Sequence, residues 1–165
     1  MTNQRPERLI LRPVDVSEAE RIAARRPAST DSWAPDFPFE GDAAGARSFL
    51  RANIERGPQQ PFGFYLVTRL ADGRAVGGIG FTGPPNDGQV EIGYGLSPSA
   101  RGQGFACEAV KALVSWAATS DVTRVIACTT HDNVASQRTL LGAGFTLETS
   151  DDEWLNYAIN LEVGP

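Results

Sequence analysis

The segment 97–106, with the sequence SPSARGQGFA, separates a stretch of alternating apolar residues from a stretch with helical spacing. The alternation predicts a strand over 89–96, and apolar residues every three or four positions predict a helix that begins near Phe105. The turn between them places free backbone N–H groups at the positive end of the helix, where an anion is stabilised. Gly102 and Gly104 let the backbone approach a ligand closely because they carry no Cβ. We therefore predict a strand, turn and helix unit that binds a phosphate or pyrophosphate.

Two common phosphate-binding loops fit this turn poorly. A Walker A loop would end in Gly-Lys-Ser/Thr, which the segment lacks. A dinucleotide fingerprint would place a third glycine at Cys107 and an acid at the end of the next strand, whereas Asp121 falls between a predicted helix and a predicted strand. A dinucleotide-binding protein remains an alternative, which a nicotinamide cofactor that raised the melting temperature would support.

Composition excludes several classes of protein. The 165 residues suit one domain over 1–165, and their net charge of −5 argues against nucleic acid as a partner. No apolar run is long enough to span a membrane, and residues 1–6 lack the apolar core of a signal peptide, so we expect a cytoplasmic protein. Two cysteines and one histidine are too few for a disulfide scaffold or a zinc site, and we expect no metal. Cys107 is interpreted as a small buried residue, with covalent acyl-cysteine chemistry as the alternative.

The order of the predicted elements indicates an α/β (α+β) fold. Asp72-Gly73 is a hairpin turn, and the helix before the strand 122–128 suits a parallel crossover. A proline-broken loop over 27–41 carries Trp33 and Phe37, whose rings either line a pocket or anchor the loop to the core. Ser17 is the expected N-cap of the first helix. The predicted strands are 8–14, 62–70, 74–81, 89–96, 122–128, 145–148 and 153–161, and the predicted helices are 17–25, 42–55, 106–117 and 133–141.

Three sequence motifs resemble the GNAT N-acetyltransferases. The spacing Arg101-x-x-Gly104-x-Ala106 is similar to the loop with which that superfamily wraps the pyrophosphate of coenzyme A. The runs ERLILRP at 7–13 and EIGY at 91–94, and the Asn-x-x-Ser pattern at 133–136 with Gly-Phe at 144–145, resemble the RimJ/RimL-type branch. The order of elements also matches over nearly the whole chain. The resemblance implies a mixed central sheet of about seven strands flanked by helices, with acetyl-CoA as co-substrate.

The resemblance also implies where acetyl-CoA lies. The strand 89–96 separates from its neighbour, the pantetheine arm fills the gap, and the backbone near Leu96 polarises the thioester carbonyl as a small oxyanion hole. Asn133 both caps its helix and reaches the pantetheine. The residues expected to bind the cofactor are Leu96, Ser97, Pro98, Arg101, Gly102, Gln103, Gly104, Phe105, Ala106, Asn133 and Arg138.

Two residues are candidates for the chemistry. Glu91 shares one face of its strand with Gly93 and Gly95, so it is the first candidate for the base that takes the proton of an amine, directly or through water. Asp31, Asp36 and Glu153 are its rivals, and a salt-bridged strand glutamate is the alternative interpretation. In many GNAT members a tyrosine protonates the thiolate of coenzyme A, but Leu140 stands at that position. The branch resemblance assigns this proton to Ser136, whose alternative role is helix capping.

The resemblance implies an N-acetyltransferase that moves the acetyl group of acetyl-CoA to a primary amine in a ternary complex. The acceptor is a protein N-terminus or a small molecule, and its expected contacts are Trp33, Phe37 and Glu91. A homodimer is one expected assembly of the chain. The chain departs from the family pattern at 141–143, where a polar pair is common, and at Gly95, where a bulky aromatic is common. A GNAT-fold domain that binds coenzyme A without turnover, as a sensor or assembly part, is therefore the alternative function.

Overall fold

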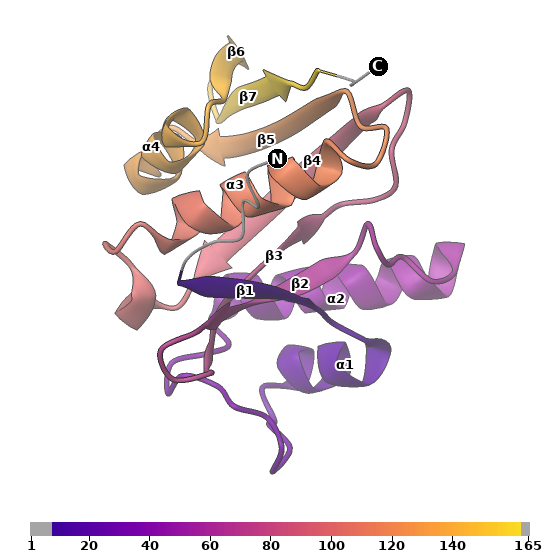
Figure 1. The fold of residues 1–165 in the computed structure, drawn as a ribbon, viewed down its shortest axis with the longest axis vertical. Coiled ribbons are helices and arrows are strands. Elements are labelled where there is room, and N and C mark those ends of the chain that lie inside the picture. The colour runs from indigo at the N-terminus through magenta and orange to yellow at the C-terminus, as the bar shows by residue number, and fades with distance from the viewer. Residues whose placement is uncertain (1–7, 163–165) are drawn as a thin grey trace.

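One mixed seven-stranded sheet organises the chain, as the computed structural model shows for residues 8–162 (Figure 1). The strand order is β1-β2-β3-β4-β5-β7-β6, and β4 and β5 are the parallel pair in an otherwise antiparallel sheet. This arrangement confirms the predicted fold class. The elements are β1 (Leu9–Pro13), α1 (Val16–Ala24), α2 (Glu40–Arg56), β2 (Phe64–Arg69), β3 (Ala75–Phe81), β4 (Gln89–Leu96), the 3₁₀ turn η1 (Pro98–Ala100), α3 (Phe105–Ala117), β5 (Arg124–Thr130), α4 (Val134–Gly142), β6 (Thr146–Ser150) and β7 (Trp154–Asn160).

The sheet splits between β4 and β5. These strands pair over three residues only, from Gln89 opposite Arg124 to Glu91 opposite Ile126. Beyond that point β4 stays paired with β3 as far as Leu96, while β5 pairs with β7 along its whole length. A gap therefore opens along the second half of β4, as expected from the family resemblance.

Helices cover the two faces of the sheet. In Figure 1, α3 crosses in front of β4, with α4 beside it, and α2 lies behind β2 and β3 next to α1. The apolar stripe predicted for α3 is buried, because Ala109, Val110, Leu113 and Ala117 all pack into the core. On the other side, Ala46 and Phe49 of α2 join the same core. The gap in the sheet thus lies between two helical layers.

Two helix starts differ from the prediction for reasons that the structure shows, and α4 begins one residue late, at Val134, because Asn133 is its N-cap. α1 begins at Val16, because the carboxylate of Asp15, and not the hydroxyl of Ser17, accepts the capping hydrogen bond from the Glu18 backbone N–H at 2.8 Å. α2 begins at Glu40, two residues before the predicted start, because the Asp42 carboxylate accepts a 2.9 Å bond from the Phe39 backbone N–H.

The loop between α1 and α2 has no helix, and its β-structure is one isolated bridge from Trp33 to Ala75 of β3. In residues 8–162 no helix is both long enough and apolar enough to cross a membrane. Residues 1–6, used above to argue against a signal peptide, and Glu7 of the ERLILRP run lie outside the described residues.

Candidate functional site

The glycine-rich turn has the geometry of an anion site. Gly102 and Gly104 adopt left-handed φ angles of +77° and +80°, which residues with a Cβ rarely adopt. Gly104 is the N-cap of α3, and no side chain caps this helix. The first backbone N–H groups of α3 therefore remain available to a ligand at the positive end of the helix dipole.

Side chains within the turn hold its shape. The Arg101 Nε donates a 3.1 Å hydrogen bond to the Leu96 carbonyl, and its guanidinium lies 5.1 Å from the centroid of the Phe39 ring. Gln103 donates to the Ser99 carbonyl at 3.4 Å. Ser97 is fully buried, and its Oγ has no hydrogen-bond partner among the described residues. The bond from Arg101 thus connects the turn to the C-terminal end of β4, where β4 is no longer paired with β5.

The loop before α2 is tied to the same turn. Asp36 accepts hydrogen bonds from the Ser99 hydroxyl at 2.7 Å and from the Ser99 backbone N–H at 2.8 Å, and these bonds lower its pKa. Asp31 accepts two bonds from Arg21, at 2.7 and 2.9 Å, which likewise lower its pKa. A carboxylate stabilised in its charged form is a weak base. Two of the three rivals to Glu91 are therefore engaged in structural contacts.

The two aromatic residues predicted to bind the acceptor pack against each other. The rings of Trp33 and Phe37 meet edge to face with centroids 5.3 Å apart, and Phe37 is 5% exposed. Neither residue lines the cavity between α2 and β4 that is described below. These contacts fit the interpretation that the rings anchor the loop to the core. Binding of an acceptor by them stays a prediction.

Ser136 and Tyr94 come together across the gap in the sheet. Their hydroxyl groups share a hydrogen bond of 2.8 Å, and burial raises the pKa of Tyr94 to about 12. Asn133 caps α4, since its Oδ1 accepts from the Ser136 backbone N–H at 3.1 Å. Arg138 is exposed on the same helix. Sequence analysis missed the contact between Tyr94 and Ser136, because only the fold brings β4 and α4 together.

Glu91 is the last residue of β4 that pairs with β5, so it lies where the gap begins. Its Oε1 accepts from the Cys128 thiol at 3.7 Å, and its Oε2 accepts from the Thr82 hydroxyl at 3.4 Å. Burial, with a smaller effect from Glu91, raises the pKa of Cys128. The structure places Glu91 on the face of β4 that the alternation predicted, opposite to the face from which Tyr94 reaches Ser136. The candidate base and the candidate acid therefore flank the gap from two sides.

Four glycines leave a bare patch on the face of the sheet that carries Glu91. Gly78 of β3 pairs with Gly95 of β4, and Gly80 pairs with Gly93. Cβ atoms on Gly93 or Gly95 would meet nothing within 4 Å, so this part of β4 faces open space. We refer to these four residues as the glycine patch. Its open half lies directly beside the split in the sheet.

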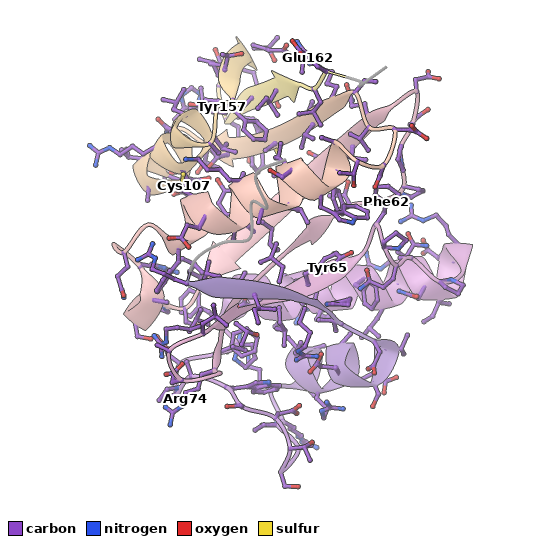
Figure 2. All side chains as sticks on the ribbon, viewed as in Figure 1. Phe62, Tyr65, Arg74, Cys107, Tyr157 and Glu162 are labelled. Carbon is purple, nitrogen blue, oxygen red and sulfur yellow. The ribbon has the colours of Figure 1, made fainter. Side chains whose placement is uncertain are left out.

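A cavity of about 430 Å³ lies between α2 and the glycine patch. Gly93 and Gly80 form part of its floor, and Phe49 and Phe64 form apolar walls. Phe62, labelled in Figure 2, also lines it and packs edge to face on Phe81 and Trp116. The charged residues on its lining come from α2 and are Arg51, Glu55 and Arg56. The cavity can hold a small apolar or aromatic group next to the open face of β4.

Asp42, which sequence analysis treated only as part of a helix, is a buried carboxylate near this cavity. It is 3% exposed, its Oδ2 accepts from the Phe39 backbone N–H, and the Gly78 backbone N–H also faces the carboxylate. Burial raises its pKa to about 6, against the opposing effects of the Phe39 and Gly78 backbone N–H groups and of Arg101 and Arg25. An aspartate in the first turn of a helix is common, so the sequence carried no signal of this burial.

The two cysteines lie apart. Cys107 is half-buried on α3, and its Sγ would lie 3.4 Å from a Cβ on Gly142 of α4, which agrees with a packing role (Figure 2). Cys128 is exposed on β5. Within the part of the chain described here, no three acidic, histidine or cysteine side chains gather into a candidate metal site.

Comparison with known proteins gives one family. Residues 8–146 match the Acetyltransferase (GNAT) domain family. A Bacillus subtilis (strain 168) protein, the uncharacterized N-acetyltransferase YjdG, is 35% identical over 111 residues, and the match covers 66% of each chain, just under two thirds of that protein. An acetyltransferase structure from Agrobacterium tumefaciens str. C58 is 26% identical, with a TM-score of 0.66 and coverage of 94% of this chain and 92% of its own. RimL, the ribosomal L7/L12 alpha-N-protein acetyltransferase in complex with coenzyme A, is 21% identical, with a TM-score of 0.69 and coverage of 96% and 97%, and shows the shared fold.

Proposed function

Since the chain belongs to the GNAT acetyltransferase family, we propose that it transfers the acetyl group of acetyl-CoA to a primary amine by direct attack in a ternary complex. The observation that carries this proposal is the N-terminus of α3, which no side chain caps and which follows two left-handed glycines. This helix end lies just after β4, the strand that separates from β5. An anion is stabilised at such a helix end, and the gap leads from it to the glycine patch.

Three features of this site support the placement that we propose for acetyl-CoA. Its pyrophosphate lies on the backbone of residues 101–106, where the N–H groups of α3 are free. Its pantetheine arm lies in the gap beside β4, whose backbone edge past Glu91 is not paired with β5. Its thioester carbonyl is polarised by the backbone near Leu96, and Asn133 at the start of α4 contacts the arm. The complex of RimL with coenzyme A supports this placement through the shared fold.

The chemistry then uses both faces of β4. The amine nitrogen forms a bond to the thioester carbon, and the bond from that carbon to sulfur breaks. Glu91 takes the proton that leaves the amine, directly or through water. Ser136 donates a hydrogen bond to the departing thiolate, which leaves as coenzyme A, and the Tyr94 hydroxyl, 2.8 Å from Ser136 Oγ, orients the Ser136 hydroxyl when it donates to that oxygen. Tyr94 thus compensates for the missing tyrosine at Leu140, which is a fully buried core residue.

The acceptor is a primary amine on a protein N-terminus or on a small molecule. RimL is a ribosomal-protein acetyltransferase by its description, which favours a protein acceptor at the level of the shared fold. The cavity between α2 and the glycine patch favours a small apolar group next to the reacting amine. The absence of a hydroxyl at Leu140 favours the second candidate function, a domain that binds coenzyme A without turnover.

The test combines binding with an acceptor screen. Gly104→Val puts a branched side chain where the pyrophosphate is proposed to lie, and we expect it to weaken binding of coenzyme A at least about tenfold. Gly73→Val is the control, because Gly73 is also left-handed, at φ +70°, but lies in the hairpin between β2 and β3. A Cβ on Gly73 would meet nothing within 4 Å, whereas a Cβ on Gly104 would lie 3.3 Å from the flexible Arg8 guanidinium, so folding of both variants is checked first. Full affinity in folded Gly104→Val would place the site elsewhere. Release of thiol from acetyl-CoA with a panel of amines then separates a transferase from a binding domain.

A further inference from the structure

The cavity between α2 and the glycine patch exists because both of its walls lack large side chains. Gly41 and Gly45 line it from the helix, and Gly80 and Gly93 line it from the sheet. A Cβ on Gly41 or Gly93 would meet nothing within 4 Å, and both residues are exposed. Gly93 also lies past Glu91, on the stretch of β4 that no longer pairs with β5. A ligand from solvent can therefore enter the cavity and reach the unpaired part of β4.

Three charged side chains line this cavity, and all of them come from the C-terminal half of α2. They are Arg51, Glu55 and Arg56, and each is exposed, so a molecule in the cavity can contact them. Within residues 8–162 none of the three takes part in an ion pair. Two positive charges and one negative charge leave this end of the cavity with a net positive charge, although the whole chain is acidic.

Arg56 reaches from α2 to the sheet at the level of the candidate base. Its Nη2 lies 3.5 Å from the carbonyl oxygen of Thr82, just after β3. Thr82 lies opposite Glu91, because its N–H donates to the Glu91 carbonyl at 3.0 Å and its hydroxyl donates to the Glu91 carboxylate at 3.4 Å. Gly93 is two residues, about 7 Å, further along β4. The positive end of the cavity therefore lies a short distance behind the place proposed for the reacting amine.

The phosphates of coenzyme A do not explain this positive charge. Their proposed place is the turn after β4, whose Arg101 guanidinium lies 5.1 Å from the ring centroid of Phe39, just before α2 begins. Arg51 and Arg56 lie in the last two turns of α2, and a helix of 17 residues is about 25 Å long. The two arginines therefore face a ligand other than the pyrophosphate.

We propose that Arg51 and Arg56 bind a carboxylate of the acceptor, while its amine lies beside Gly93. The inference rests on the proposed function and narrows the acceptor to an amine that also carries a carboxylate, with an apolar or aromatic body between the two groups. The planar guanidinium group presents paired N–H donors that match a carboxylate. Phe49 and Phe64 form the apolar walls against which the body of the acceptor packs.

Binding of two matched probes tests the proposal without turnover. 4-(Aminomethyl)benzoate carries an amine and a carboxylate at opposite ends of a benzene ring, and 4-(aminomethyl)benzamide has the same body with a neutral amide. Both are titrated at about pH 7.5, where the carboxylate is charged, into the full chain saturated with coenzyme A. The proteins are the wild type, the double variant Arg51→Gln/Arg56→Gln and the control Arg47→Gln. Arg47 is an exposed residue one turn before Arg51 on α2, and it does not line the cavity.

We expect the wild type and Arg47→Gln to bind the benzoate at least about fivefold more tightly than the benzamide. The double variant should bind the two probes equally and keep the affinity of the wild type for the benzamide, and each single variant should lose part of the preference. Glu55→Gln should enlarge the preference, because it removes the opposing charge from the cavity lining.

No preference in the wild type, or a preference that survives in both single variants and in the double variant, overturns the proposal. A preference that Arg47→Gln loses as fully as the double variant also overturns it, since the charge of the whole helix would then be the cause. A wild type that prefers the benzoate but acetylates no amine refutes the proposed function and leaves this carboxylate site standing.

Discussion

The buried Asp42 carboxylate should make the folded protein less stable as the pH rises. Its pKa rises from an ordinary value of 3.8 to about 6 in the folded state, so folding favours the protonated form. A difference of this size corresponds to about 3 kcal/mol of unfolding free energy. The destabilisation is absent below about pH 4, develops between about pH 4 and pH 6, and is complete above that range.

Asp42→Asn imitates the protonated carboxylate and should remove this penalty. We expect the variant to be more stable than the wild type by up to about 3 kcal/mol near pH 7.5, and equal to it near pH 4. The amide oxygen can still accept from the Phe39 backbone N–H, so the cap of α2 should persist.

Urea unfolding followed by circular dichroism, repeated from about pH 4 to pH 8, measures the difference. Glu40→Gln is the control, because Glu40 is exposed and its replacement should leave the pH dependence unchanged. A variant that is less stable than the wild type near pH 7.5, or a difference that does not vary with pH, would refute the reasoning.

Four further substitutions test the proposed mechanism. Ser136→Ala should lower turnover more than affinity for acetyl-CoA, because its hydroxyl acts when charge builds on sulfur. Tyr94→Phe should have a smaller effect of the same kind. Unchanged turnover of Ser136→Ala, under conditions where chemistry limits the rate, would mean that Ser136 only caps its helix. Glu91→Gln should lower turnover roughly 10²-fold and remove the acid limb of the pH–rate profile, without changing the affinity for coenzyme A. An acid limb that persists in this variant would show that another group takes the proton of the amine. Gly93→Leu fills open space, so it should fold normally and raise KM for the acceptor alone, and equal KM values would move the acceptor away from the cavity.

Local patterns predicted most of the fold. The alternation over 89–96 and the helical spacing after Phe105 depend on neighbours in the chain, and both elements form as predicted. The helix starts were less predictable, since Asp15 and Ser17 are both good caps and only their placement selects Asp15. The start of α2 at Glu40 likewise depends on a bond that Asp42 makes back to Phe39.

The site could be predicted only in part, because it combines residues that are distant in sequence. The glycine turn was visible, since its function depends on backbone conformation in one short segment. The contact of Tyr94 with Ser136 depends on how β4 and α4 pack, and no local pattern reports it. The burial of Asp42 depends on a bare glycine in a neighbouring strand. Asp31 and Asp36 looked like bases in the sequence, because the hydrogen bonds from Arg21 and Ser99 that stabilise their charge come from other segments.

Transfer of a labelled acetyl group tests the central claim most directly. The full chain is incubated with acetyl-CoA that carries a deuterated acetyl group and with the amines found in the acceptor screen, and mass spectrometry follows both the amine and the protein. We predict that the label appears as an amide on the acceptor, that free coenzyme A forms in equal amount, and that Cys107 and Cys128 stay unmodified. Label on either cysteine before the acceptor is added, or coenzyme A bound without any labelled amide, would contradict direct acetyl transfer.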